Sequence, residues 1–273
     1  MNQQNLYSVI LERIFRSKFK IGMQTVEFER QDIEKFAGIL RVRLPKNLGD
    51  LIYSFRFRTE MPQSIRKTAA KGKAWAILLA GRGKYRFILR PDTPLIPNPS
   101  MSMTKVPDAT PGVIAKYAQS DEQAVLAKVR YNRLVDIFTG VACYSLQNHL
   151  RTTVVGMGQV EMDEIYIGVD KKGAHYVFPV QAKGGKDKLN IVQIEQDFEL
   201  CSSKFPSLIC RPLGVQLLSN EQIALFEFEL GENGIGLVSE KHYKLVPPDD
   251  VTEDDLRRLC PGTCRKVNSA FCL

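Results

Sequence analysis

The sequence predicts an α/β protein in which a mixed β-sheet is flanked by helices and preceded by a smaller, basic α+β domain. Three observations support this prediction. Strand-like and helix-like segments alternate after residue 113, a proline-rich stretch precedes them, and the positive charge is concentrated in residues 1–90. With 273 residues the chain is long enough for two domains.

The charge of the chain is unevenly distributed. Its formal net charge is +8, but residues 1–90 hold 19 Lys and Arg against 7 Asp and Glu, whereas residues 91–273 hold 19 against 23. A basic segment of this kind suits a polyanion such as DNA, because each neutralised phosphate releases counterions. The alternative is a basic domain whose charge only keeps it in solution.

The elements of the basic segment favour a DNA-binding domain. Apolar spacing predicts helices over residues 6–19, 31–40 and 46–54 and a short strand over 26–28. The second and third helices resemble a helix-turn-helix, with Lys46 at the exposed start of the third and residues 55–65 as the wing of a winged form. A hairpin is predicted from 74–79 and 85–89, and its turn presents Arg82 and Lys84 either to a phosphate backbone or to solvent.

The proline-rich stretch is the predicted domain boundary. Residues 91–112 contain six prolines, which favour an extended linker. The second domain is then expected over 113–248 and a C-terminal tail over 249–273. Cys260, Cys264 and Cys272 in this tail have no fourth metal ligand nearby in sequence, so they do not predict a zinc site.

A long helix is expected at the start of the second domain. Ser120 and Gln123 form a capping-box pattern, and apolar spacing extends this helix, with a break near Gly140, as far as His149. Asp136 lies beside its apolar stripe. Asp136 is therefore either a residue of the site or a solvated carboxylate on the helix surface.

A β-hairpin follows and collects polar side chains at one end. Residues 159–169 nearly alternate in polarity, and residues 174–182 form a second β-rich run after a turn at 170–173. Because side chains alternate across a strand, Glu161 and Asp163 share one face, as do Gln181 and Lys183 on the partner strand. The hairpin can therefore bring carboxylates, an amide oxygen and an ammonium together, or form an ordinary salt bridge.

At these residues the sequence resembles the PD-(D/E)xK nuclease superfamily, which has the restriction-endonuclease-like fold. The resemblance rests on Asp163, on Gln181, Ala182 and Lys183 at the end of the next strand, and on the helix predicted over 189–202. Gln181 stands where the family usually has Asp or Glu. A minority branch, including Mrr-like restriction enzymes, has this Q-x-K form.

The resemblance implies a Mg²⁺ site, with Mn²⁺ as an alternative ion. Asp163, the Gln181 side-chain oxygen and the Ala182 carbonyl would bind the metal, and Lys183 would position water or offset charge on phosphorus. Further metal ligands implied by the family are Glu161 on the same face and Asp136 on the preceding helix. Polar residues of the following helix, Gln193 and Gln196, would approach the substrate strand, or form an exposed helix face.

The function implied is a magnesium-dependent DNA endonuclease of restriction or phage defence, a hydrolase of phosphodiester bonds. Two alternatives remain: a non-catalytic DNA-binding regulator with a degenerate nuclease fold, which Gln181 keeps open, and a protein–protein adaptor. Cutting both strands of a duplex would call for a homodimer. The chain has no apolar run of membrane-span length and no signal-peptide pattern, so we expect a cytoplasmic protein without membrane contact.

Overall fold

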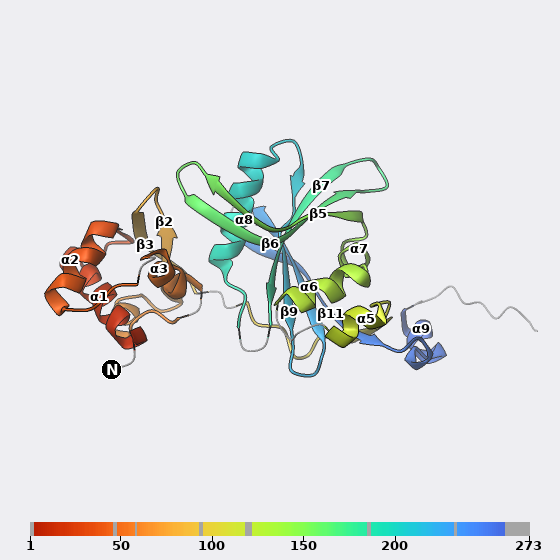
Figure 1. Cartoon of the computed structure of the whole chain (residues 1–273). Coiled ribbons are helices and arrows are strands. Elements are labelled where there is room, and N and C mark those ends of the chain that lie inside the picture. Colours follow the sequence, from red (N-terminus) through yellow and green to blue (C-terminus); the bar gives the residue numbers. More distant parts are fainter. Residues whose placement is uncertain are drawn as a thin grey trace, which may run out of the picture.

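The computed structural model describes residues 3–45, 48–57, 59–92, 95–117, 122–184, 187–231 and 234–259. The described chain is a mixed α/β protein whose larger part is an open mixed sheet flanked by helices, as the sequence predicts (Figure 1). A smaller N-terminal part has its own hydrophobic core, formed entirely from residues 10–87. No helix in the described part is long and apolar enough to cross a membrane.

The N-terminal part packs helices onto a three-stranded antiparallel sheet of strand order β1-β3-β2. Buried aromatic side chains join the two layers, with Phe15 edge-on to both Trp75 and Phe87. The elements in chain order are α1 (Gln3–Lys18), β1 (Thr25–Glu29), α2 (Arg30–Leu40), α3 (Leu48–Phe57), α4 (Gln63–Arg66), β2 (Lys73–Leu79) and β3 (Lys84–Pro91).

The predicted wing over residues 55–65 is wrong. Phe55 is buried one helical turn after Leu51 and Ile52, so its side chain extends the apolar face of α3, and the short helix α4 follows. The hairpin predicted from residues 74–79 and 85–89 is confirmed as β2 and β3.

The larger part is built on an eight-stranded sheet with the order β4-β11-β10-β9-β7-β6-β5 and β8 beside β7. The pair β7–β9 is parallel, whereas β6–β7 is antiparallel. The strands are β4 (Met103–Pro107), β5 (Ala142–Val154), β6 (Gly158–Val169), β7 (His175–Lys183), β8 (Ile209–Cys210), β9 (Leu213–Leu217), β10 (Ile223–Gly231) and β11 (Gly234–Val246).

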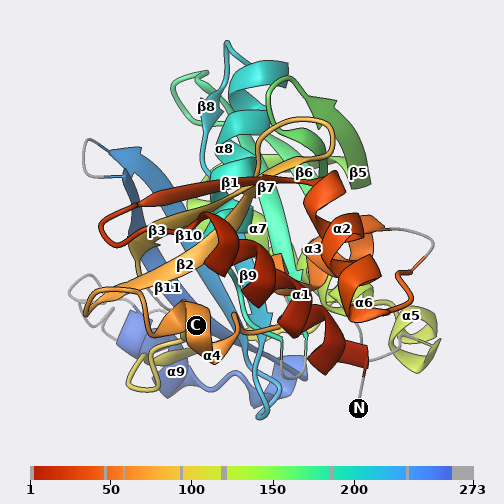
Figure 2. The ribbon, with the colours of Figure 1, turned by 90° about the vertical axis from the view of Figure 1, so that its left-hand side faces the viewer.

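Helices cover both faces of this sheet. After the short helix α5 (Gly112–Tyr117), α6 (Glu122–Tyr131) and α7 (Leu134–Thr139) pack on one face. The helix α8 (Ile191–Lys204) packs on the other, where Leu200 and Cys201 contact the sheet. Figures 1 and 2 show the N-terminal part on the α8 side, and Asn190 at the start of α8 bonds to the Arg56 carbonyl.

The long helix expected from residue 120 to His149 is two helices, α6 and α7, among the described residues, and it is wrong after residue 139. Ser120, its predicted N-cap, lies outside the described residues. Gly140 ends α7 in a left-handed conformation with φ of 69°, and residues 142–154 form β5, paired antiparallel with β6. Most side chains of β5 are exposed, so the strand lacks the apolar alternation that would reveal it in sequence. Pairing with β6 outweighs the helical spacing of the sequence here.

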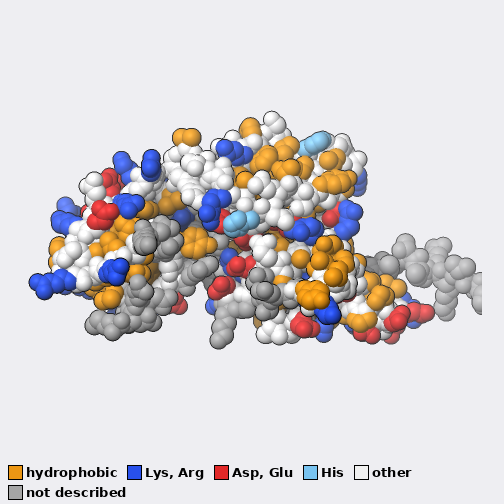
Figure 3. Space-filling model, viewed as in Figure 1, with side chains coloured by type: hydrophobic (Ala, Val, Ile, Leu, Met, Phe, Trp, Pro, Cys, Tyr) orange, Lys and Arg blue, Asp and Glu red, His pale blue; other side chains and the backbone are white. Residues whose placement is uncertain are grey.

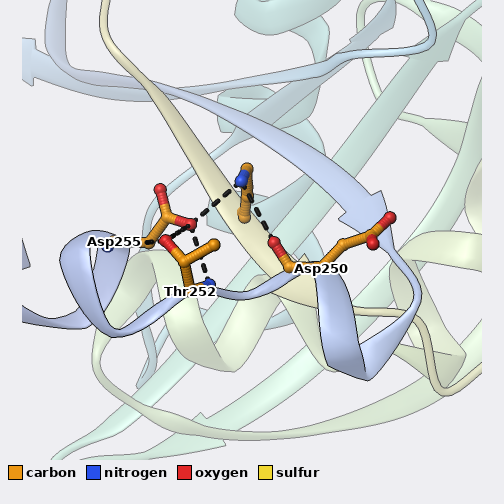
Figure 4. Close-up of polar contacts among 4 residues, drawn as sticks. Asp250, Thr252 and Asp255 are labelled. Carbon is orange, nitrogen blue, oxygen red and sulfur yellow. Dashed lines mark hydrogen bonds and ion pairs between the residues drawn. The ribbon is translucent and has the colours of Figure 1, made fainter.

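The predicted linker contributes a strand to the sheet, and the described part of the predicted tail contacts this strand. Residues 103–107 of the proline-rich stretch form β4, which pairs in parallel with β11. Lys105 of β4 donates to the Asp250 carbonyl at 3.1 Å and to Asp255 of the last helix, α9 (Glu253–Leu259), at 2.9 Å (Figure 4). Hydrogen bonds from Thr252 and Lys105 hold the pKa of Asp255 below its ordinary value.

Gly168 of β6 offers a test of the packing around the central hairpin. A Cβ at this position would lie 2.7 Å from both Phe178 Cε2 and Val141 Cγ1, whereas a Cβ at Gly236 of β11 would meet nothing within 4 Å. We expect Gly168→Ala to lower the free energy of unfolding by about 1–3 kcal/mol. Urea denaturation should show Gly236→Ala close to the parent protein, and equal effects of both substitutions would contradict this packing.

Candidate active site

The candidate site lies where β6 and β7 separate. Their ladder ends at the pair Glu164 and Val180, after which β7 pairs with β9. The Ala182 N–H donates instead to Asp163 Oδ2 at 2.8 Å. Asp163 therefore bridges the opening between two strands, which holds its carboxylate at one position.

Gln181 lies beside this opening in a network with α8. Its Nε2 donates to Asp197 Oδ1 at 2.8 Å, and its Oε1 accepts from Gln193 Nε2 at 3.3 Å. A carboxylate can only accept hydrogen bonds, so Asp197 turns the amide nitrogen of Gln181 toward itself. The amide oxygen is thereby directed away from Asp197.

Lys183 is the cation of the cluster. Its side chain is 11% exposed, and its Nζ lies 3.4 Å from Glu122 Oε1 at the first turn of α6. Glu161 has different partners: its carboxylate lies 2.9 Å from His149 Nε2 and 3.1 Å from Arg151 Nη2, both on β5. The two basic groups on β5 therefore face Glu161, and Lys183 faces the helix.

Burial dominates the acid–base properties of the site. It raises the pKa of Asp163 above the ordinary value, against the Ala182 N–H and the Lys183 charge, which lower it. Asp197 is fully buried, which raises its pKa well above the ordinary value despite the hydrogen bond from Gln181. Carboxyls in this environment release their protons more readily when a cation is near.

A cleft of about 1040 Å³ gives access to these groups. From the larger part it is lined by the hairpin β5–β6, the start of α6 and the α8 residues Gln193 and Gln196. Across from them lie α3 and the β2–β3 loop, including Arg82. Side chains of both charge signs gather between the two parts on the face shown in Figure 3.

The structure brings together most of the predicted site residues. The cleft is lined by Asp163, Gln181, Lys183, Glu161, Arg82, Gln193 and Gln196. Ala182 is buried in the core and reaches the site through its main chain. Of the two alternatives for Gln193 and Gln196, the exposed helix face is wrong, because they are 7% and 5% exposed and both line the cleft.

Three predicted site residues are not among those that line the cleft: two lie away from it, and one is outside the described residues. Asp136 does not line the cleft; it pairs with Arg133 and accepts from the Cys143 N–H at the start of β5. Lys84 also lies off the cleft, 3.9 Å from Glu29. Lys46 lies outside the described residues.

Sequence reasoning missed Glu122, Asp197, His149 and Arg151. Glu122 lies in the first turn of α6, 14 positions before Asp136, and contacts Lys183. Asp197 lies one turn after Gln193 on α8, a spacing that could have linked it to the cluster. The sequence predicts a helix where the structure has β5, so it does not predict that His149 and Arg151 lie beside Glu161.

The buried carboxyl of Asp197 predicts a pH-dependent stability. Because its native pKa is raised, its contribution is present below the ordinary Asp pKa and is lost as the pH rises through the native pKa. Asp197→Asn keeps an acceptor for Gln181 and should raise the free energy of unfolding at pH 8 on the order of 1 kcal/mol. Urea denaturation at pH 5 and pH 8 measures this, and a variant less stable at pH 8 would contradict it.

The donor set of the site is rich in oxygen. Asp197 Oδ2 and Gln193 Oε1 are buried and have no hydrogen-bond partner among the described residues. Within the same described ranges, no three His, Cys, Asp or Glu side chains stand close enough to hold a metal ion by themselves. A cation here would therefore need amide or main-chain oxygens as well, which Gln181 and its neighbours offer.

Comparisons with known proteins assign no family to the chain. No family model matches it, and no curated protein or solved structure matches it significantly.

Proposed function

We propose that the protein is a metal-dependent DNA endonuclease with a restriction-endonuclease-like core, belonging to the Q-x-K form of the PD-(D/E)xK superfamily. The observation that carries this proposal is that Asp163 and Lys183, from two neighbouring strands, line one cleft. They are close enough for the Lys183 charge to lower the pKa of Asp163. A restriction or phage-defence role agrees with this chemistry.

In this proposal Asp163 and Lys183 have different roles in phosphodiester hydrolysis. Asp163 is held by the Ala182 N–H, so one carboxylate oxygen is fixed and the carboxylate is oriented for an ion. Mg²⁺ or Mn²⁺ at these oxygens would polarise the phosphoryl oxygen and acidify bound water. The Lys183 ammonium orients the attacking water and offsets the negative charge that develops on the phosphate.

With Gln181 in place of an Asp or Glu, the cluster has one negative charge fewer. Two neighbouring carboxyls compensate for this missing charge. Asp197 lies within hydrogen-bond distance of Gln181, and Glu122 lies beside Lys183. Both carboxyls can offset the charge of a divalent cation held by Asp163, Gln181 and the Ala182 carbonyl. Glu161 is less suited to be a ligand, because its carboxylate already pairs with Arg151 and contacts His149.

The N-terminal part supports DNA as the partner. Its elements follow the order helix, strand, helix, helix, with a closing hairpin whose second strand lies between the other two. Apart from the short helix α4 before the hairpin, this order resembles that of a winged helix, in which α3 would be the second helix of the helix-turn-helix and the β2–β3 loop the wing. Arg82 on that loop is exposed and forms no ion pair with a described residue.

The proposal is tested by incubating the purified chain with supercoiled plasmid in Mg²⁺, in Mn²⁺ and in EDTA. Nicked or linear plasmid in either metal and intact plasmid in EDTA are expected. DNA binding without cutting in any of these conditions would favour the non-catalytic regulator instead.

A further inference from the structure

The N-terminal part presents its candidate DNA-reading elements to the catalytic cluster. The cleft that contains Asp163 is lined on its other side by α3, through Ile52, Tyr53 and Arg56, and by the β2–β3 loop. These are the second helix of the helix-turn-helix and the wing. Both elements therefore face Asp163 across the same space.

Two contacts with α8 hold this arrangement. Asn190, which caps α8 by accepting from the Val192 N–H, also donates to the Arg56 carbonyl at the end of α3, at 2.9 Å. Arg90 at the end of β3 forms an ion pair with Glu195 of the same helix α8. Since α8 also carries Gln193 and Asp197, one helix positions both the α3 wall and the partners of Gln181.

Basic groups lie on both sides of the cleft, beside the acids Glu122, Glu161 and Asp163. On its floor, His149 and Arg151 lie on β5, and Lys183 lies at the end of β7. Arg82 stands across from them on the β2–β3 loop. Phosphate contacts of this kind set the register of a protein on DNA, whereas base contacts from an inserted helix read sequence.

We infer that double-stranded DNA binds between α3 with the β2–β3 loop and the Asp163 cluster, so that the chain reads and cuts the same segment of DNA. This inference rests on the proposed function for its cutting half. The cleft volume of about 1040 Å³ matches pockets for small ligands. A specific duplex complex buries about 1,000–2,500 Å² of protein, so the inference requires the contacts of Arg56 and Arg90 with α8 to open when DNA binds.

Site-specific crosslinking tests this placement without requiring cutting. Full-length Asp163→Asn protein would carry a photo-crosslinking aromatic residue at position 53 on α3, at 159 on the cleft floor, or at 86 as a control. Arg86 is exposed on β3 and does not line the cleft. We expect adducts from 53 and 159 within one helical turn of each other, about 10 base pairs, and none from 86. Adducts on separate segments would overturn the inference.

A binding measurement gives an independent arm. With a labelled duplex in EDTA, Arg82→Ala should weaken binding about 5-fold and lower the salt dependence by about one counterion, whereas Arg86→Ala should not. Equal effects of the two substitutions would overturn the placement. Adjacent adducts, together with no plasmid cutting by the parent protein, would overturn the nuclease function but not the placement of DNA in the cleft. Cutting by the parent protein together with distant adducts would overturn the placement but not the nuclease function, and no DNA binding would overturn both.

Discussion

Replacing Asp163 by asparagine is expected to abolish DNA cutting, with a loss of at least about 10³-fold in rate. Asparagine keeps an oxygen acceptor for the Ala182 N–H, so the opening between β6 and β7 stays bridged. It removes the carboxylate charge that would hold the divalent cation. Nicking of supercoiled plasmid under single-turnover conditions measures the rate, and thermal unfolding verifies the fold.

Asp170→Asn is the matched control for this substitution. Asp170 lies in the turn of the same hairpin, outside the cleft, and asparagine can still accept from the Lys172 and Ala174 N–H groups. It should cut at the rate of the parent protein. Asp163→Asn protein that cuts within about 10-fold of the parent would contradict the role of Asp163, since metal ligands normally cost more.

Replacing Lys183 by methionine should reduce cutting about 10²–10³-fold, the range seen when one charge-stabilising donor is removed. Methionine retains the length of the buried stem but lacks the ammonium. Without it, the pKa values of Asp163 and Asp197 lose the lowering influence of the Lys183 charge, so both rise further. Residual cutting should therefore need a higher pH and more Mg²⁺, because the carboxyls must lose their protons to bind metal.

A pH profile distinguishes this role from a structural one. Lys188→Met, which removes an exposed lysine outside the cleft, should leave both the rate and its pH dependence unchanged. If Lys183→Met lowers the rate equally at every pH and every Mg²⁺ concentration, Lys183 acts on the transition state alone. If the rate is unaffected, Lys183 has no part in the chemistry.

Local patterns in the sequence were enough for the central hairpin and for the elements around it. Residues 158–169 nearly alternate, and residues 175–183 form a β-rich run on the other side of a glycine-containing turn. A one-residue slip would turn the apolar side chains of the first strand away from the core. Asp163, Gln181 and Lys183 follow directly from this parity. The charge of residues 1–90 and the helices of the N-terminal part were likewise readable in sequence.

Only the tertiary structure decided which distant residues complete the site. The sequence order of the chain does not place Glu122 beside Lys183, because this pairing depends on how α6 crosses the sheet. The sequence order also does not predict the hydrogen bond between Gln181 and Asp197. It does not predict the contacts of His149 and Arg151 with Glu161 either, because their strand β5 has a helical pattern in the sequence. Periodicity reports which face of an element is buried, whereas the burial of polar groups depends on what another element places against them. The cleft between α3 and Asp163 arises in the same way, from contacts that join residues more than 100 positions apart in the chain.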